Sequence, residues 1–347
     1  MTPPPSHRGS WKWAIAVLVV LHTLVAFAGF FAPYDPETQH RDVPLAPPSP
    51  IRFIDEEMRW HLRPFVYAQV ANESVKAGYR EDTENKFPIE FLVRGTEYQV
   101  VGLWSCDRHF FGVVQPGRIF LFGTDSYGRD VFSRFLYGGR ISLAAGLLAA
   151  AISLLLALLL GGIAGYYGGW VDGLIMRLAE LFLSLPWLYM LFAVRAFLPL
   201  NLDASRAFFL IISLVGLISW ARPARIIRGI VLTAKERDFV LAARSFGAGD
   251  FYLLWRHILP QALSVALTQT ALLVPAYILA EVTLSFLGLG VNEPVASWGN
   301  MLGALQQYSV LVTAWWMFTP GIALIFVIWS YHSLAAALES HWRTVQV

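Results

Sequence analysis

The sequence has a single cysteine among 347 residues, and only 14% of its residues are charged. One cysteine excludes an internal disulfide framework and a metal site built from several cysteines. No GxxxxGK[ST] occurs, and the Gly-rich stretch at 161–170 lacks the lysine that would hold a phosphate, so no nucleotide-binding P-loop is expected. HExxH, GxSxG and a paired-carboxylate constellation are missing as well. We therefore predict no catalytic residue, no metal site and no cofactor bound by this chain.

Apolar residues are what the chain has in excess, at 56% of the sequence with a mean hydropathy of +0.53. This composition is typical of an integral membrane protein. A membrane span needs about 20 mostly apolar residues. Because lipid offers the backbone no hydrogen-bond partners, the fold class expected is an all-α bundle. Six segments qualify as spans: 11–31, 140–163, 174–199, 207–229, 261–285 and 310–336.

Lysine and arginine are distributed unevenly among the loops. The loop 222–257 has seven of them, whereas none occurs between Arg256 and Arg343. The positive-inside rule therefore places 222–257 in the cytoplasm and the loop 286–309 on the other side. Counting through six spans then puts both chain termini in the cytoplasm.

The two ends of the chain are predicted to be short cytoplasmic tails, 1–10 and 337–347. The first span, with its exit at 11–33, is interpreted as an uncleaved anchor. A signal peptide over 8–30 is the alternative, because a basic start and an apolar run precede the small-x-small site at 26–28. The apolar run is longer than the core of an ordinary signal peptide, which favours the anchor.

The segment 236–260 lies between two long apolar runs and is too polar to cross a bilayer. Gly247 provides the backbone freedom to leave a first helix, and Asp250 is placed to cap a second short helix over 251–257. Pro260 falls where the next span is expected to begin, in a first turn that needs no donor N–H. We predict a helix–glycine–helix element exposed at the membrane surface.

This segment resembles the EAA loop of importer permeases in the ABC transporter superfamily. The shared pattern is Ala-Ala, three residues, glycine, nine residues and then x-x-Leu-Pro. The glutamate that names the motif is Leu241 here, and its isoleucine is His257. In that family the loop is a coupling helix that docks into a groove of the ATPase subunit. The residues to which this role carries over are Ala242, Ala243, Gly247, Asp250, His257, Leu259 and Pro260.

Further stretches resemble one branch of these permeases, which imports dipeptides, oligopeptides and nickel. Within that branch they resemble the type of subunit that contains the motif GTDxxGRD. They lie in the family's order over most of 123–320: GTDSYGRDVFSRFLYGGRISL (123–143), GYYGGWVDGLIMR (165–177), SLPWL (184–188), AEVTLSFLGLGV (280–291) and WGNML (298–302). The resemblance implies a six-helix type I importer permease with a five-span core over 140–336, in the bacterial inner membrane.

The resemblance also implies partners. They are a homologous second permease in a heterodimer, two ATPase subunits that use ATP and Mg²⁺, and an extracytoplasmic solute-binding protein. A dipeptide, an oligopeptide, a nickel complex or another small solute is compatible as substrate. A membrane-anchored scaffold or receptor that acts through 50–122 is the alternative function.

The region 34–122 departs from the family, since residues 50–122 separate two motifs that lie close together in relatives. We predict a small mixed α/β extracytoplasmic insertion, with a hairpin turn at 94–97 and a short helix over 66–78. The insertion either contacts the solute-binding protein or partly covers the translocation path, or else it only stabilises the outer face. Strands are expected at 89–95, 98–103 and 117–122.

Charged residues in or near the spans suggest a second functional region. Glu281 lies in the fifth span and either lines the pathway or pairs with an arginine of the bundle. The segment 123–139 has apolar residues on one side and Arg129, Asp130 and Arg134 on the other. We predict an amphipathic helix over 125–138 at the outer interface, and the family resemblance places it beside the external gate.

Overall fold

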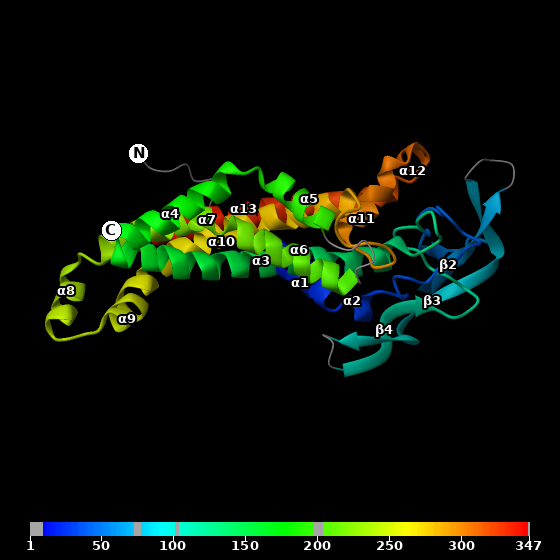
Figure 1. The fold of residues 1–347 in the computed structure, drawn as a ribbon. Helices are drawn as coiled ribbons and strands as arrows, with labels where there is room; N and C mark the ends of the chain where they lie inside the picture. Colours follow the sequence, from blue (N-terminus) through cyan, green and yellow to red (C-terminus); the bar gives the residue numbers. More distant parts are fainter. Residues whose placement is uncertain (1–9, 73–77, 101–103, 198–203, 346–347) are drawn as a thin grey trace, which may run out of the picture. The chain divides into compact units, whose positions relative to one another are not determined.

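A computed structural model describes residues 10–72, 78–100, 104–197 and 204–345 (Figure 1). The chain divides into two compact units, each built from separate stretches of sequence. Unit 1 comprises Met1–Leu18, Ala144–Glu281 and Val327–Val347, and unit 2 comprises Val19–Leu143 and Val282–Phe326. Each unit is considered by itself below.

Unit 2 contains a four-stranded antiparallel sheet in which the strands pair in sequence order (Figure 1). The expected helix over 66–78 is wrong for its described part, because residues 66–72 belong to the second strand. The expected strand at 117–122 is irregular. The described insertion is therefore a β structure and not a mixed α/β one. Its strands are β1 (Arg52–Ile54), β2 (Trp60–Asn72), β3 (Gly78–Val100) and β4 (Trp104–Val113).

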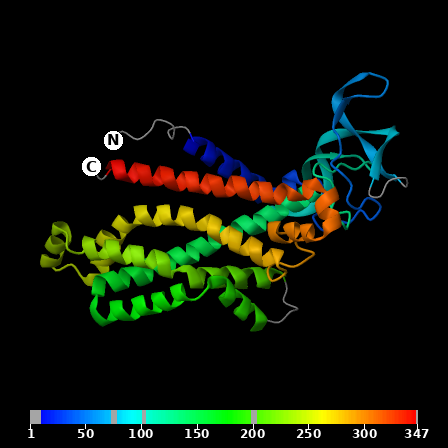
Figure 2. The same ribbon diagram turned by 90° about the horizontal axis from the view of Figure 1, so that it is seen from above.

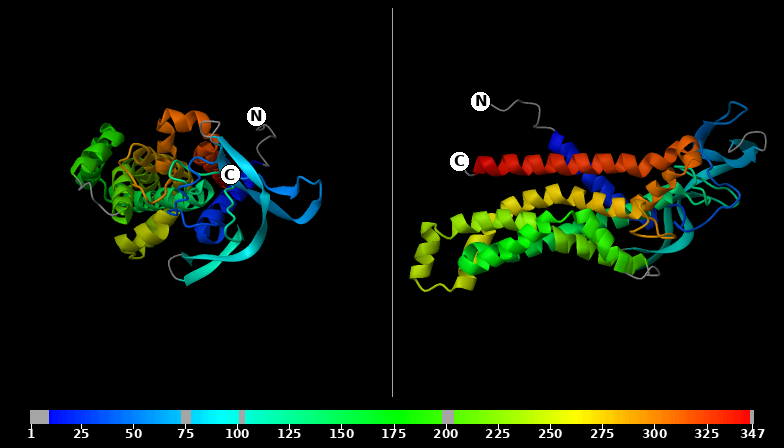
Figure 3. Two further views of the ribbon diagram at one scale, coloured as in Figure 1. Left: turned by 90° about the vertical axis from the view of Figure 1, so that its right-hand side faces the viewer. Right: turned by 45° about the horizontal axis from the view of Figure 1, so that its top comes forward.

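The expected hairpin turn at 94–97 is also wrong. Strand β3 runs through it, and its pairing with β4 continues on both sides, with a register shift between Arg94 and Tyr98. A bulge of this kind bends and twists a strand without ending it. Figure 3 shows the resulting twist of the long strands. Residues 101–103 of the expected strand 98–103 lie outside the described residues.

One face of the sheet is apolar and buried. Val66, Ile89 and Phe111 form a cluster with Ile119, and Phe132 packs against it. Sequence-distant residues thus come together because alternate side chains of adjacent strands share a face.

Asp55, at the end of β1, fixes the connection to β2. Its carboxylate has no exposed area and accepts hydrogen bonds from His61 Nε2 at 2.9 Å, Lys86 Nζ at 2.6 Å and the Arg59 amide at 2.9 Å. The hydrogen bonds from His61 and Lys86 hold the pKa of Asp55 well below its usual range. A buried carboxylate with donors from three residues is stable in its charged form.

The helices carry most of the rest of the chain (Figures 1 and 2). Most residues of the long helices belong to unit 1. Four helices contribute residues to both units: α1, α3, α10 and α13. The helices outside the segment 236–260 and the loop 287–318 are α1 (Ser10–Ala26), α2 (Ala28–Phe31), α3 (Val131–Tyr167), α4 (Gly169–Ser184), α5 (Trp187–Phe197), α6 (Ala204–Ser219), α7 (Ala221–Ala234), α10 (Leu259–Phe286) and α13 (Thr319–Val345).

By length and composition, three helices in the described part of the chain could cross a membrane: Val131–Tyr167, Asp250–Phe286 and Trp315–Ser340. A fourth results if the bent pair Phe208–Ser219 and Ala221–Ala234 is one span. The apolar helix at 11–26 is shorter. Four of the six expected spans therefore have a matching helix or helix pair, and the spans at 11–31 and 174–199 stay predictions.

Proline accounts for the breaks in two expected spans. Leu185, before Pro186, has an extended backbone with φ −85° and ψ 133°, because a residue before proline is disfavoured in the helical region. This separates α4 from α5. Pro223 lies in the first turn of α7, and the axis bends by 42° between α6 and α7. Proline removes a hydrogen bond and crowds the preceding turn, which explains a bend at this place.

Helices α3 and α7 pack closely in unit 1 through two glycines. A Cβ atom at Gly161 would lie 2.5 Å from the Ala224 carbonyl oxygen, and one at Gly165 would lie 2.8 Å from that of Arg228. The spacing is GxxxG, which lets two helix backbones approach in a membrane. The end of α3 is thereby fixed against α7.

The loop after α10 forms a compact part of unit 2. It contains α11 (Trp298–Gly303), the 3₁₀ turns η3 (Ala304–Gln306) and η4 (Trp315–Phe318), and α12 (Tyr308–Thr313). Ser297 and Asn300 form a reciprocal capping box at the start of α11. Trp298 is fully buried, stacks on Phe135 at 5.6 Å and donates to the Phe135 carbonyl at 2.9 Å.

Candidate functional site

The segment Asp238–Ile258, here called the coupling segment, is a two-armed helical element in unit 1. Its arms are α8 (Asp238–Ser245) and the pair α9 (Asp250–Tyr252) and η2 (Leu253–Ile258), with a tight turn between them (Figure 3). Gly247 in that turn has φ +88°, a conformation that glycine adopts without steric cost. The helix–glycine–helix layout expected from the sequence is present.

Two local expectations in the coupling segment are wrong. Gly249 and not Asp250 is the N-cap of the second arm, and Asp250 is its first helical residue. The second arm also runs into α10 without a break, through π-helical residues. Pro260 is therefore inside a continuous helix.

The π turn explains how the helix accommodates Pro260, which has no N–H to donate. Leu259 donates its amide five residues back, to the Leu254 carbonyl. The Gln261 side chain donates to the His257 carbonyl at 2.8 Å. A backbone hydrogen bond that spans five residues and a side-chain donor thus replace the usual four-residue backbone bonds at the place where proline would otherwise break the helix.

The inward side of the coupling segment is apolar and buried. Val240, Leu253, Leu254 and Ile258 belong to one cluster with Tyr166 at the end of α3. Asp250 also points toward this end of α3, where its carboxylate accepts a hydrogen bond from the Tyr166 hydroxyl at 2.6 Å. Both arms are therefore anchored to the helix bundle of unit 1.

The outward side of the coupling segment carries large apolar side chains. Phe246 in the turn is 92% exposed, and Phe251 in the second arm is 75% exposed. Exposed apolar groups gathered on one element indicate a protein interface. The exposed set is Phe239, Leu241, Phe246, Phe251, Tyr252 and Trp255.

The other residues predicted for this site differ in how far they are exposed. Ala242 is exposed, whereas Ala243 is half-buried and packs against the apolar cluster. His257 is half-buried, with its ring 5.2 Å from that of Tyr252, and Leu259 is buried. Of the alanine pair, only Ala242 can form a flat contact surface.

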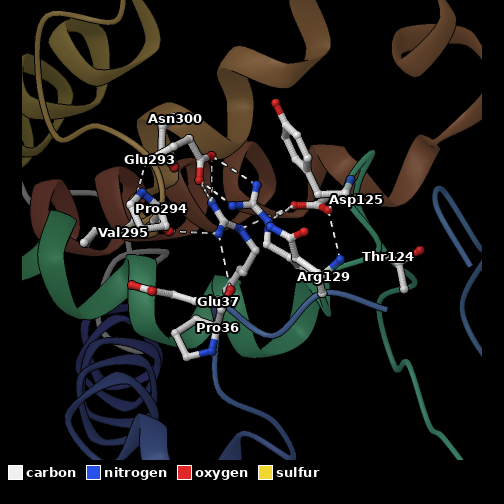
Figure 4. A network of polar contacts seen from close by, with 12 residues as sticks. Pro36, Glu37, Thr124, Asp125, Arg129, Glu293, Pro294, Val295 and Asn300 are labelled. Carbon is white, nitrogen blue, oxygen red and sulfur yellow. Dashed lines mark hydrogen bonds and ion pairs between the residues drawn. The ribbon is translucent and has the colours of Figure 1, made fainter. Parts of the chain in front are cut away.

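A network of charged side chains lies in unit 2 (Figure 4). Arg129 donates to Asp125 Oδ2 at 2.7 Å and to Glu293 Oε2 at 2.5 Å. Arg134 donates to Glu293 Oε1 at 2.9 Å and to the carbonyls of Pro36 and Pro294 at 3.3 and 3.2 Å. Arg129, Arg134 and Asp125 are buried, whereas Glu293 is 45% exposed. Two carboxylates balance the two arginines, so the burial of the arginines is compensated.

This network connects the GTDSYGRD motif to the loop after α10. The motif is a loop and not a helix: Asp125 accepts from the amides of Tyr127 and Arg129, and α3 begins only at Val131. Of the amphipathic helix expected over 125–138, only 131–138 is helical. Its exposed charged side is wrong, because Arg129 and Arg134 are buried and pair with Glu293 far along the chain.

Asp130 ends the motif and caps α3. Its Oδ2 accepts from the Ser133 amide at 2.8 Å and from the Ser133 hydroxyl at 2.6 Å. Its Oδ1 has no hydrogen-bond partner among the described residues. Burial raises the pKa of Asp130 to about 7, outweighing the bonds to Ser133 that lower it.

Glu293 is a member of this network that was not predicted, although the sequence contains a signal for it. It is the only Asp, Glu, Lys or Arg between Glu281 and Glu339, and a lone acid in such a stretch needs basic partners from elsewhere. Glu281 is 2% exposed. Its side chain is enclosed by the chain's own fold, and its predicted role in the pathway stays a prediction.

Comparison with known proteins identifies the family. The sequence profile of the binding-protein-dependent transport system inner membrane components matches residues 157–344, more than half of the chain. The chain belongs to this family. It is thus a permease, and its curated relatives include dipeptide and oligopeptide permeases of the branch that the sequence suggested.

Three curated relatives of this permease are named as transport permeases. The dipeptide transport system permease protein DppC of Bacillus subtilis is 38% identical over 63% of this chain and 66% of its own length. The oligopeptide permease OppC of the same species is 35% identical over 70% and 75%. The glutathione permease GsiD of Pectobacterium atrosepticum is 34% identical over 65% and 72%. The permease therefore spans about two thirds to three quarters of their lengths.

Proposed function

We propose that this permease forms one half of the translocation pathway of an ABC importer and that its coupling segment receives the movement of separate ATPase subunits. The observation that carries the proposal is the two-sided character of the coupling segment. Val240 and Leu253 on one side are fully buried in unit 1, while Phe246 and Phe251 on the other are 92% and 75% exposed.

An element of this kind can act as a lever. Its buried side moves with the helices to which it is packed, because close-packed interiors transmit strain. Its exposed side can bind a groove, and full burial of a phenylalanine contributes about 1.5–3 kcal/mol. Moving a two-state equilibrium from one end to the other takes about 5.5 kcal/mol, which a few such contacts and ATP binding at two sites can supply.

The partners follow from this role. A homologous second permease would complete the pathway, two ATPase subunits would bind ATP and Mg²⁺, and an extracytoplasmic solute-binding protein would deliver the substrate. The names of the three relatives refer to dipeptides, oligopeptides and glutathione. We therefore take short peptides or a related small solute as the substrate class.

The orientation belongs to the same proposal. The coupling segment lies in the cytoplasm, together with both termini, and the sheet formed by β1–β4 lies on the opposite side. Seven basic residues between 222 and 257 support this placement.

Co-purification tests the proposal. The tagged chain is co-expressed with its transporter and purified in detergent, and the ATPase subunits that accompany it are quantified. Phe246→Asp should strongly reduce their yield, because it places a charge in the apolar contact. Tyr308→Asp is the matched control, since Tyr308 is 79% exposed on α12 in unit 2.

An equal yield of ATPase subunits from Phe246→Asp and the wild type would contradict the proposed contact. If no ATPase accompanies even the wild type, the alternative gains support, namely a membrane-anchored scaffold that acts through 50–122.

A further inference from the structure

The hydroxyl of Tyr166 joins the two arms of the coupling segment. Tyr166 lies in the last turn of α3 and is 7% exposed. Its Oη donates to Asp250 Oδ1 at 2.6 Å, and Arg244 Nη2 donates to the same Oη at 3.0 Å. Arg244 lies in the last turn of the first arm, and Asp250 is the first residue of the second arm. One oxygen atom therefore closes the turn that contains Gly247.

Other contacts of Tyr166 fix its position. The Arg244 guanidinium carbon lies 5.7 Å from the centre of the Tyr166 ring, within the range of a cation–π interaction. Lys235, just after α7, donates to the Tyr166 carbonyl oxygen at 3.4 Å. The ring itself is part of the apolar cluster with Val240 and Leu253. Tyr166 thus contacts the coupling segment by its ring and by its hydroxyl.

The two glycines of the turn have open space around them, whereas Ala248 between them packs against the apolar cluster. A Cβ atom placed at Gly247 or Gly249 would meet no atom within 4 Å. Side-chain packing at these two glycines therefore does not set the angle between the arms. The bonds of the Tyr166 hydroxyl to Arg244 and Asp250 cross the turn directly and do constrain this angle.

We propose that Tyr166 is a positioning residue that holds the two arms at a fixed angle and transmits their movement to α3. The inference rests on the proposed function, because it presumes that ATPase subunits move the coupling segment. A rigid connection passes a displacement of the arms to α3, whereas a loose one lets the arms move while the helix stays. Loss of the hydroxyl should then reduce transport per ATP hydrolysed.

The test uses the reconstituted transporter with its binding protein and compares Tyr166→Phe with Tyr167→Phe. Tyr166→Phe keeps the ring in the apolar cluster and removes only the oxygen. Tyr167 is the adjacent residue, and its side chain is 57% exposed. Substrate uptake and ATP hydrolysis are measured on the same vesicles, and their ratio is the readout.

We expect Tyr166→Phe to lower uptake per ATP about tenfold, the effect of one hydrogen bond to a charged group, and Tyr167→Phe to leave the ratio unchanged. Asp250→Ala should give the same defect, and the double variant no further loss, because both remove one connection. A proportional fall of uptake and hydrolysis in Tyr166→Phe would overturn the inference, since it indicates lost assembly only.

A second comparison separates this inference from the proposed function. If Gly247→Val uncouples hydrolysis from uptake and Tyr166→Phe does not, the coupling segment acts as proposed and the role of Tyr166 is wrong. If neither variant changes the ratio, the proposed function of the coupling segment fails as well.

Discussion

Replacing Gly247 by valine perturbs the coupling segment through its backbone alone. The residue has φ +88°, and a Cβ atom there would meet nothing within 4 Å. Valine therefore causes no clash with neighbours, but its branched side chain disfavours positive φ. Relief of this strain requires the turn to change, and with it the angle between α8 and α9.

The size of the effect follows from the cost of a left-handed backbone. For an L-residue this cost is about 1–2 kcal/mol, and asparagine tolerates the conformation better. A change of that size shifts an equilibrium between two arm positions by about 5-fold to 30-fold. We expect the loss of uptake per ATP to increase from Gly247→Asn through Gly247→Ala to Gly247→Val, with ATP hydrolysis retained.

Gly249 provides the control within the same turn. It also has open space around it, but its φ is −70° and it is the N-cap of α9. Gly249→Ser places a preferred N-cap residue there and should leave uptake per ATP unchanged. The assay is paired measurement of uptake and hydrolysis in proteoliposomes. Equal behaviour of Gly247→Val and Gly249→Ser would refute the reasoning.

Three further predictions concern unit 2. The contribution of Asp130 to the free energy of unfolding should fall as pH rises from 3.8 to about 7, because the folded chain holds a proton on Asp130 that the unfolded chain releases earlier. Thermal unfolding curves of Asp130→Asn should lack this contribution. Arg134→Met should lower the unfolding temperature more than Arg134→Lys. Losing one member of a buried ion pair costs about 3–5 kcal/mol, and the cost is smaller here because the partner Glu293 is 45% exposed. Equal effects of the two variants would contradict the network. The double variant Trp60→Ser, Leu62→Ser should change the free energy of unfolding by less than about 0.5 kcal/mol, because these side chains are 65% and 81% exposed. Reduced uptake by this variant at limiting binding protein would indicate that the sheet contacts the binding protein. Unchanged uptake would indicate that the sheet only stabilises the outer face.

The layout of the coupling segment could be predicted because its signals are local. A glycine, a short helix on each side of it and a proline after them all lie within residues 236–260. The anchoring by Tyr166 could not be predicted, because the residue is 84 positions from Asp250 in sequence. Two adjacent tyrosines at a helix end do not show which one is buried.

The charged network shows the same limit. Arg134 looks like a solvent-facing residue of an amphipathic helix when only its neighbours are considered. Its main partner, Glu293, is 159 positions away in sequence. In the folded chain Arg134 is therefore buried, although its neighbours in sequence suggest that it is exposed. Family motifs located the residues, but their burial depended on a pairing that one sequence does not reveal.

The insertion was mispredicted for a different reason. Residues 65–67 are all buried although they lie in one strand, so the alternation typical of a half-buried strand is hidden. At 94–97 a glycine between charged and polar residues resembles a turn, and yet β3 continues through it as a bulge. Local turn signals do not distinguish a bulge from a hairpin.

Cross-linking at Phe246 tests the central claim most directly. Cys106 is the only cysteine, so Cys106→Ser gives a background in which Phe246→Cys is unique in this chain. A short thiol-to-amine cross-linker should join this residue to an ATPase subunit in the assembled transporter, and the yield should change when ATP and Mg²⁺ are added. If Phe246→Cys reacts only with reagents on the extracytoplasmic side and never cross-links to an ATPase subunit, the account of the coupling segment is wrong.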